Sequence, residues 1–235
     1  MIPISVCIIT KNESDNLEKC LSALASYPFE IVVVDTGSTD NSKEIARKYT
    51  DKVYDFTWIE DFSAARNYAA GRASHNMIFP VDTDEFVTRL DWDALQSLIA
   101  NNPKSVGSIK RLDYFEEDGE RHCQTCLIDR IYNRKYYHYD KPIHEVLAPL
   151  TKHPYTSYAA PVEADHVGYL GSGDKLKEKA MRDMELLRRE LEENPDEPYY
   201  YFQIAQSYML MRDLDNALTY LRQAVEHRPD PQDDY

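Results

Sequence analysis

The sequence contains little glycine, and neither of the two common glycine-rich phosphate loops occurs in it. Only 7 of its 235 residues are glycine. After the first apolar run, dinucleotide-binding proteins carry G-x-G-x-x-G and P-loop enzymes carry G-x-x-x-x-G-K-[ST]. This chain has Thr10-Lys11-Asn12-Glu13 there. The glycine- and arginine-rich loop of a sugar-nucleotide pyrophosphorylase is missing too. Dinucleotide dehydrogenases and P-loop enzymes are therefore poor candidates.

Cysteine is also scarce, with 4 residues in the chain. Cys7 and Cys20 fall on the apolar faces of predicted elements, where cysteine packs as a small hydrophobic residue. Cys123 and Cys126 form a lone C-x-x-C. It has no second pair at zinc spacing, and it does not open a helix of the thioredoxin type. We predict neither a disulfide framework nor a zinc or redox centre.

Positive charge and long apolar runs are the remaining deficits. The chain has 27 Lys and Arg against 41 Asp and Glu, a formal net charge of −14, which argues against nucleic acid or an anionic membrane as its main partner. No apolar stretch is long enough to span a bilayer, and Met1-Ile2-Pro3 leads directly into the first predicted strand without a signal peptide. We expect a cytoplasmic protein, with peripheral attachment to a membrane left open.

The first hundred residues alternate between apolar runs and helical patterns. Short runs rich in β-branched residues predict strands at Ile4–Thr10, Ile31–Asp35, Val53–Phe56 and Met77–Val81. Apolar residues at helical spacing lie between them, over 17–24, 45–49 and 62–73. Ser14 and Ser38-Thr39-Asp40 are the predicted caps of the first two helices. Strands alternating with helices predict a parallel sheet covered on both faces.

Strands are also predicted at Val106–Ile109 and Leu127–Tyr132, with a hairpin signal at Asp118-Gly119.

The tetrapeptide Asp82-Thr83-Asp84-Glu85 directly follows the Met77–Val81 run. Carboxylates there would lie in the crevice beyond the strand ends, where open α/β sheets bind ligands. In extended backbone the side chains of Asp82 and Asp84 would point the same way. Two such oxygen donors suit Mg²⁺ or Mn²⁺, which one or two carboxylates hold together with substrate phosphates. The alternative is an acidic turn that ends the strand and caps the next helix.

Four segments together resemble a family 2 glycosyltransferase, in that family's order and spacing. They are Ser5–Glu13 (SVCIITKNE), Ile31–Asp40 (IVVVDTGSTD), Phe62–Asn67 (FSAARN) and Asp82–Glu85 (DTDE). The chain departs from the commoner pattern at Thr36, where a second Asp is usual. The resemblance implies a GT-A fold, a nucleotide-sugar donor, with UDP as the expected nucleotide, and inversion at the anomeric carbon.

The resemblance also implies a donor site. Asp35 would hold the base and ribose, with Thr10, Asn12 and Glu13 nearby on the first loop. Arg66 would neutralise the diphosphate.

Lys11 or Arg130 could assist Arg66. Asp82 would touch the ribose or a metal-bound water, and Asp84 would bind the divalent cation, Mn²⁺ or Mg²⁺.

Two later residues match further roles of such enzymes by their order in the chain. Glu145, in Pro142-Ile143-His144-Glu145, would be the catalytic base that takes the acceptor proton. His166 would complete the metal shell. A solvated His-Glu hydrogen bond in a loop is the structural alternative for the first pair, and Asp129 or Asp113 are the next candidates for the base.

The C-terminal part predicts a separate helical architecture, so we divide the chain into 1–170 and 171–235. A first helix carries Leu176, Ala180, Met184, Leu187 and Leu191 and ends at Asn194-Pro195-Asp196. Residues 198–231 then resemble one tetratricopeptide (TPR) repeat, by the spacing of Tyr201, Ile204, Ala205, Tyr208, Ala217, Leu221, Ala224 and Pro229.

The last residue, Tyr235, lies one repeat length after Tyr201. A single repeat cannot bury its own apolar face. We therefore expect that the natural chain continues, or that the repeat packs on the enzyme, on another copy or on a partner protein. A plain helical hairpin that closes the fold is the alternative.

Two other functions stay open at this stage. One is a degenerate transferase domain that presents its repeat to a partner protein, and the other is a sugar nucleotidyltransferase. The acceptor could be a lipid carrier, a polysaccharide, a protein or a peptide.

Overall fold

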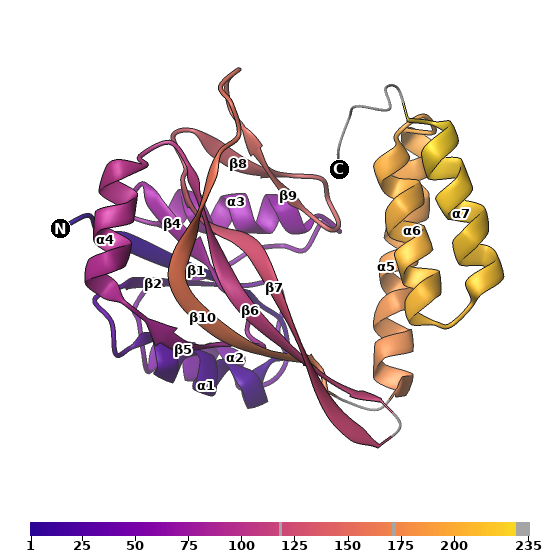
Figure 1. Ribbon diagram of the computed structural model, residues 1–235. Helices are drawn as coiled ribbons and strands as arrows, with labels where there is room; N and C mark the ends of the chain where they lie inside the picture. The colour runs from indigo at the N-terminus through magenta and orange to yellow at the C-terminus, as the bar shows by residue number, and fades with distance from the viewer. Residues whose placement is uncertain (118, 171–172, 229–235) are drawn as a thin grey trace. The chain divides into compact units, whose positions relative to one another are not determined.

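The chain divides into two compact units, Met1–Leu170 and Gly171–Tyr235. The computed structural model describes residues 1–117, 119–170 and 173–228 (Figure 1). The first unit contains β1 (Ile4–Thr10), α1 (Ser14–Leu24), β2 (Glu30–Asp35), α2 (Ser42–Arg47), β3 (Val53–Asp55), α3 (Phe62–Arg72), β4 (Met77–Pro80), β5 (Glu85–Leu90), α4 (Trp92–Asn101), β6 (Val106–Glu117), β7 (Glu120–Asn133), β8 (Tyr137–Asp140), β9 (Val146–Pro149) and β10 (Ser157–Tyr169).

Eight of these strands form one sheet in the order β3-β2-β1-β4-β7-β6-β10-β5, and β8 pairs with β9 separately. The first four strands of that order are all parallel, as are β6 and β10. β7 runs antiparallel to β4 and β6, and β5 runs antiparallel to β10. The predicted α/β class, a mostly parallel sheet with flanking helices, is confirmed.

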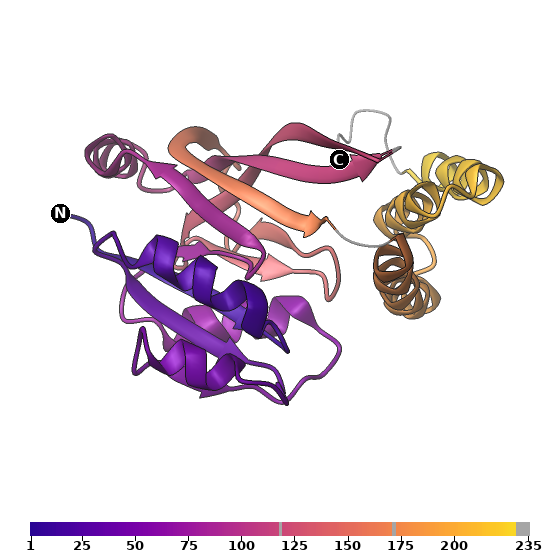
Figure 2. The same cartoon turned by 90° about the horizontal axis from the view of Figure 1, so that it is seen from below.

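Alternate residues of the first strands enter different cores, which is why helices cover both faces (Figures 1 and 2). Val6 and Ile8 pack with the apolar residues of α1 and α2. Cys7 and Val32 pack on the other face with the alanines of α3. Cys7 and Cys20 are both buried as free thiols, and their predicted packing in the core is confirmed.

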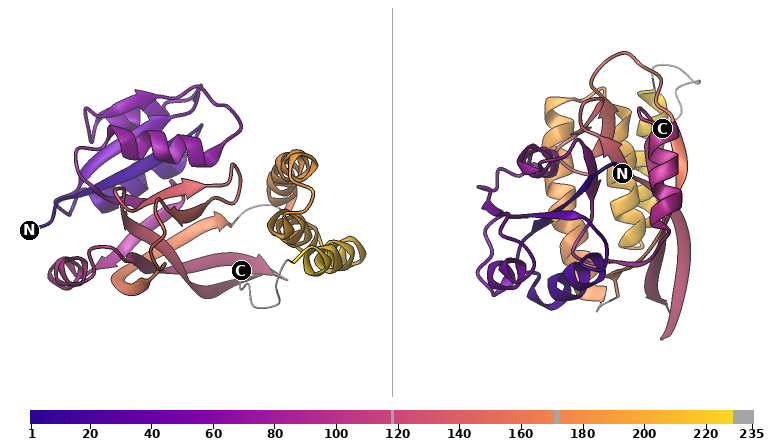
Figure 3. Two further views of the ribbon diagram at one scale, coloured as in Figure 1. Left: turned by 90° about the horizontal axis from the view of Figure 1, so that it is seen from above. Right: turned by 90° about the vertical axis from the view of Figure 1, so that its left-hand side faces the viewer.

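The β6–β7 hairpin is confirmed, and its strands are longer than their apolar runs. The register pairs Glu117 with Glu120, and Gly119 adopts a φ of 80°, which suits glycine in a turn. Asp118 lies outside the described residues. The two strands continue beyond the core as a ribbon (Figure 3). Most residues at the start of β7 are polar and exposed, so the sequence contains no apolar pattern that predicts this extension.

The predicted helix caps are wrong in detail. Ser14 is the first helical residue, and Glu13 occupies the cap position without a side-chain bond. The Ser14 N–H instead donates to Asp40 Oδ2 at 3.1 Å. Asn41 occupies the cap position of α2 without a side-chain bond, and this helix ends before Tyr49. Asp40 thus serves two helix starts, since its Oδ1 also accepts from the Ser42 N–H at 3.0 Å. Local sequence alone cannot reveal such a contact between loops.

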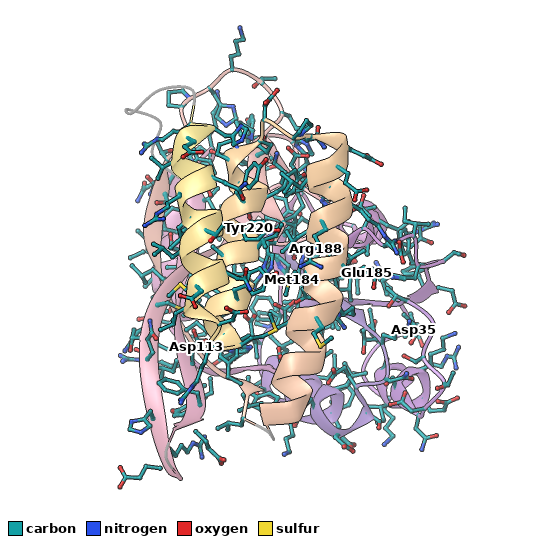
Figure 4. All side chains as sticks on the ribbon, turned by 90° about the vertical axis from the view of Figure 1, so that its right-hand side faces the viewer. Asp35, Asp113, Met184, Glu185, Arg188 and Tyr220 are labelled. Carbon is teal, nitrogen blue, oxygen red and sulfur yellow. The ribbon has the colours of Figure 1, made fainter. Side chains whose placement is uncertain are left out.

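Over residues 173–228, the described part of the second unit, the chain forms three helices, α5 (Gly173–Glu193), α6 (Pro198–Leu210) and α7 (Leu214–Glu226). Figure 4 looks onto these helices and labels Met184 on α5 and Tyr220 on α7. Ala205 and Ala217, two small residues of the TPR-like spacing, are both buried. The side chains of Leu176, Pro229 and Tyr235 lie outside the described part of the chain. Among the described residues, none of the helices is both long and apolar enough to cross a membrane.

Candidate active site

The carboxyl ends of β1, β2 and β3 place three predicted or neighbouring polar residues side by side. Thr10 pairs with Asp35 across β1 and β2, and Asp35 pairs with Asp55 across β2 and β3. Asp35 is 1% exposed. Its Oδ1 accepts from the N–H groups of Gly37 and Ser38, both at 2.9 Å. Its Oδ2 and the Thr10 hydroxyl are buried without a hydrogen-bond partner among the described residues.

The other two predicted residues of the first loop fasten it to the loop after β2. Asn12 adopts a φ of 55°, and its Oδ1 accepts from the Thr39 N–H at 2.7 Å. The Glu13 N–H donates to Ser42 Oγ at 3.0 Å. Asn12 and Glu13 therefore shape the rim beside Thr10 and Asp35.

The two aspartates of the tetrapeptide do not converge, which corrects the prediction made for extended backbone. β4 ends at Pro80, and the chain turns so that the Glu85 N–H donates to the Asp82 carbonyl oxygen at 3.0 Å. The turn leads into β5 and not into a helix. As a result the carboxylate of Asp82 faces two arginines, whereas that of Asp84 faces His166.

Asp82, which is half-buried, belongs to a cluster of ion pairs with largely buried arginines. Arg66 Nη2 lies 2.7 Å from Asp82 Oδ1, and Arg130 Nη2 lies 2.7 Å from Asp82 Oδ2. Arg130 Nη2 is also 2.7 Å from Oε1 of Glu85, which is 1% exposed. Burial alone would raise the pKa of Asp82, but the charges of the two arginines outweigh it and hold the pKa well below its usual range.

Arg66 connects this cluster to the predicted base. It lies on α3, whose start is capped by Asp61 through the Ala64 N–H at 2.8 Å. Arg66 Nε donates to Oε1 of Glu145, whereas Arg66 Nη1 is buried without a partner in the described part of the chain. Burial opposes the charge of Arg66, but Asp82 and Glu145 together raise its pKa. Glu145 is therefore an ion-pair partner in this structure.

Asp84 and His166 do meet, as their predicted shared role requires. His166 Nε2 lies 3.4 Å from Asp84 Oδ2, and His166 Nδ1 lies 2.9 Å from Asp113 Oδ1. Gly168 faces the same point. A Cβ atom there would lie 2.2 Å from Asp84 Oδ2 and 2.7 Å from His166 Nε2. Only glycine, which has no Cβ atom, fits against these two side chains.

These contacts form a continuous ring from one end of the Asp82–Asp84 turn to the other. Arg111 completes it, with its Nη1 3.2 Å from Glu85 Oε1 and its Nε 2.6 Å from Asp113 Oδ1. In order, the ring contains Asp82, Arg130, Glu85, Arg111, Asp113, His166 and Asp84, and Arg66 and Glu145 branch from Asp82.

The ring and its branch carry more negative than positive charge. Five carboxylates face three guanidinium groups, so two negative charges are in excess when His166 is neutral.

Sequence reasoning missed the roles of Glu85, Arg111 and Gly168, and it considered Asp113 only as a substitute base. A signal existed for two of them. Arg111 and Asp113 are two apart in a strand and so share a face. Glu85 and Gly168 gave none, because their importance depends on which strands become neighbours.

Comparison with known proteins agrees with the four motifs. The sequence matches the family described as Glycosyl transferase family 2 over residues 5–157, which is more than half of the chain. The chain therefore belongs to glycosyl transferase family 2.

Two curated relatives match nearly the whole chain. A TPR repeat-containing protein of Synechococcus elongatus is 28% identical over 98% of this chain and 59% of its own length. The SPbeta prophage-derived glycosyltransferase SunS of Bacillus subtilis is 24% identical over 96% of this chain and 54% of its own length. The chain thus spans little more than half the length of these relatives.

Among solved structures, S. aureus TarS 1–349 is similar. Its complex with UDP-GlcNAc has a TM-score of 0.53 at 15% identity, covering 97% of this chain and 93% of the TarS 1–349 chain. Its complex with UDP has a TM-score of 0.52 at 17% identity, covering 97% and 92%. At this identity the similarity concerns the fold, and it confirms the predicted GT-A type.

Proposed function

We propose that this protein transfers a sugar from a nucleoside diphosphate, UDP, to a nucleophile on an acceptor, with inversion at the anomeric carbon. The two buried, unpaired oxygens at the ends of β1 and β2, Thr10 Oγ1 and Asp35 Oδ2, carry this proposal. A buried polar atom without a partner costs about 1–3 kcal/mol. N–H and hydroxyl groups of a base and ribose can satisfy both. The name of SunS and the UDP and UDP-GlcNAc complexes of TarS support the same chemistry.

Asp84 and His166 fit a divalent cation, Mn²⁺ or Mg²⁺. The two ligand atoms, Asp84 Oδ2 and His166 Nε2, lie 3.4 Å apart, and a divalent cation would match the excess of two negative charges. Within the described residues no group of three or more His, Cys, Asp or Glu side chains could hold a metal. A cation that takes its remaining ligands from the donor diphosphate needs no such group. Bound there, it would neutralise charge on the leaving diphosphate.

The residues of the branch have complementary roles in this proposal. Arg66 presents Nη1 to the diphosphate, and Asp82 and Arg130 hold the guanidinium in place. Arg66 also orients Glu145 through Oε1. We assign the second oxygen of Glu145 to the acceptor proton, as general base.

Thermal unfolding with UDP tests the donor site. UDP at about a hundred times its dissociation constant adds about 2.7 kcal/mol to the unfolding free energy, and the shift in Tm should be larger with Mn²⁺ present. Asp35→Asn should reduce this shift. Asp55→Asn is the matched control, because Asp55 is the neighbouring carboxylate on β3 and its side chain is 76% exposed.

If no nucleoside diphosphate raises the Tm, the donor-site assignment is wrong. With UDP-sugars as substrates, release of UDP supports a transferase, whereas release of pyrophosphate would identify a nucleotidyltransferase.

For the second unit we propose a TPR-like repeat formed by α6 and α7 that packs against a further helical repeat. Leu214, Leu218 and Val225 follow one face of α7 and are 69%, 49% and 74% exposed. A repeat of this kind buries such a face on its neighbour. The name of the Synechococcus relative supports this assignment.

A further inference from the structure

Asp113 lies behind His166, on the side of the imidazole ring away from Asp84. The two residues are register partners on the parallel strands β6 and β10. Asp113 Oδ1 is 2.9 Å from His166 Nδ1, and the two residues are 9% and 5% exposed. The ring of His166 also packs edge-on against Tyr169, with 4.8 Å between the centroids. Both side chains are therefore largely enclosed.

Other side chains hold Asp113 as a fixed acceptor. Arg111 Nε is 2.6 Å from Asp113 Oδ1, and Arg111 Nη2 donates to Oδ2 at 3.1 Å. Cys126 Sγ lies 3.3 Å from Oδ2. Arg111 thus pairs with both oxygens of the Asp113 carboxylate. An ionised carboxylate only accepts hydrogen bonds.

This geometry decides where the proton of a neutral His166 resides. Because a neutral imidazole carries a single N–H, donation from Nδ1 to Asp113 leaves Nε2 with a lone pair. That lone pair faces Asp84 Oδ2 at 3.4 Å. Two acceptors that face each other require a positive group between them. A second proton on His166 or a metal cation can supply it.

We propose that Asp113 is a positioning residue that holds His166 in the Nδ1–H tautomer and so makes Nε2 a ligand for the cation shared with Asp84. This inference rests on the proposed cation role of Asp84 and His166. A carboxylate on the second nitrogen fixes the ring and makes the ligating nitrogen more basic. In the rival arrangement, a doubly protonated His166 bridges Asp84 and Asp113 and leaves no ligand for a cation.

Nitrogen NMR of the wild-type protein separates the two arrangements, because it reports which nitrogens of the His166 imidazole carry a proton. His166 is one of 7 histidines, and its signals are those that disappear in His166→Gln. With UDP and Mg²⁺, we expect a proton on Nδ1 and none on Nε2. Removing Mg²⁺ should shift the Nε2 resonance. Protons on both nitrogens, or on Nε2 alone, with UDP and Mg²⁺ present would overturn the proposal.

Mn²⁺ affinity tests the consequence for binding. In the presence of UDP, Asp113→Asn should raise the Mn²⁺ dissociation constant by about 10–100-fold, the usual effect of losing such a partner. Free Mn²⁺ can be followed by electron paramagnetic resonance. Asp165→Asn is the matched control. It removes the same charge next to His166, but from a carboxylate that contacts the Tyr114 hydroxyl at 3.4 Å. UDP binding without metal should be the same in both variants.

The outcomes are distinguishable. If His166→Gln weakens Mn²⁺ binding and Asp113→Asn does not, Asp113 is not a positioning residue. If neither substitution changes Mn²⁺ affinity, the proposed cation site is itself wrong.

Discussion

At the scale of single residues, Gly168 has the least freedom to change. Gly168→Ala alters no ligand and no charge. Its methyl group would nevertheless clash with Asp84 Oδ2 and His166 Nε2. We expect Mn²⁺-dependent UDP binding to weaken by at least about tenfold, comparable to the loss of a residue that supports a metal ligand. Calorimetric titration with UDP, with and without Mn²⁺, measures this effect.

Gly71→Ala is the control, because a Cβ at Gly71 meets nothing within 4 Å. Equal UDP affinities in wild type and Gly168→Ala, both with Mn²⁺, would show that Asp84 and His166 bind no cation.

The ion pair between Glu145 and Arg66 sharpens the test of the base. Glu145→Gln should leave UDP binding with Mn²⁺ intact, because a base acts on the acceptor and Arg66 keeps its contact with Asp82. Sugar transfer should fall by roughly 10²–10⁴-fold. Comparing turnover with UDP affinity in the same variant separates the two effects, and Glu163→Gln on β10 is a control for the loss of a carboxylate.

Parallel loss of nucleotide binding would assign Glu145 to the donor site. Asp129, which accepts from Ser108 and Tyr155, would then be the better base candidate, since Asp113 is engaged with His166.

At the scale of elements, apolar patterns predicted the inner strands and helices closely, and polar contacts explain the misses. β1 occupies the predicted residues, and α3 begins at the predicted Phe62. The cap of α1 was misassigned because Asp40 reaches across from another loop. The divergence of Asp82 and Asp84 depends on a tight turn and on arginines from α3 and β7. The spacing of two aspartates contains no information about partners so distant in sequence.

The packing of α6 against α7 depends on small residues. Ala217, 3% exposed, is the buried residue of α7, so Ala217→Leu should destabilise the helical unit by about 1–3 kcal/mol through overpacking. Leu218→Ala is the matched control, and at this half-exposed position it should change stability by less than about 0.5 kcal/mol. Urea unfolding followed by circular dichroism measures both. A larger effect of Leu218→Ala would place the buried face of α7 on the other side.

At the scale of the whole molecule, the ion-paired carboxylates predict that the stability of the folded protein decreases in acid. The pKa of Asp82 is lowered in the folded protein, against about 3.9 for an unfolded aspartate. Its contribution to stability is therefore fully present above about pH 4, and it is lost as the pH falls from there toward the lower folded pKa. Tm measured against pH should show wild type more stable than Asp82→Asn near neutrality, with the difference shrinking below about pH 4.

The comparison with Asp82→Asn isolates this group from the many other carboxylates of a chain with net charge −14. A difference that stays constant down to the lowest pH tested would contradict the assigned pKa.

The ring that joins the two ends of the Asp82–Asp84 turn also has a kinetic consequence. Its contacts are distant in sequence, with a separation of 48 positions from Asp82 to Arg130 and of 53 positions from Asp113 to His166. Closing such long loops is costly before the strands are paired, so we expect the ring to form after the folding barrier. Interactions made after the barrier slow unfolding and leave the folding rate unchanged. The charges that prepare this site for its donor would then also set how long the folded protein lasts.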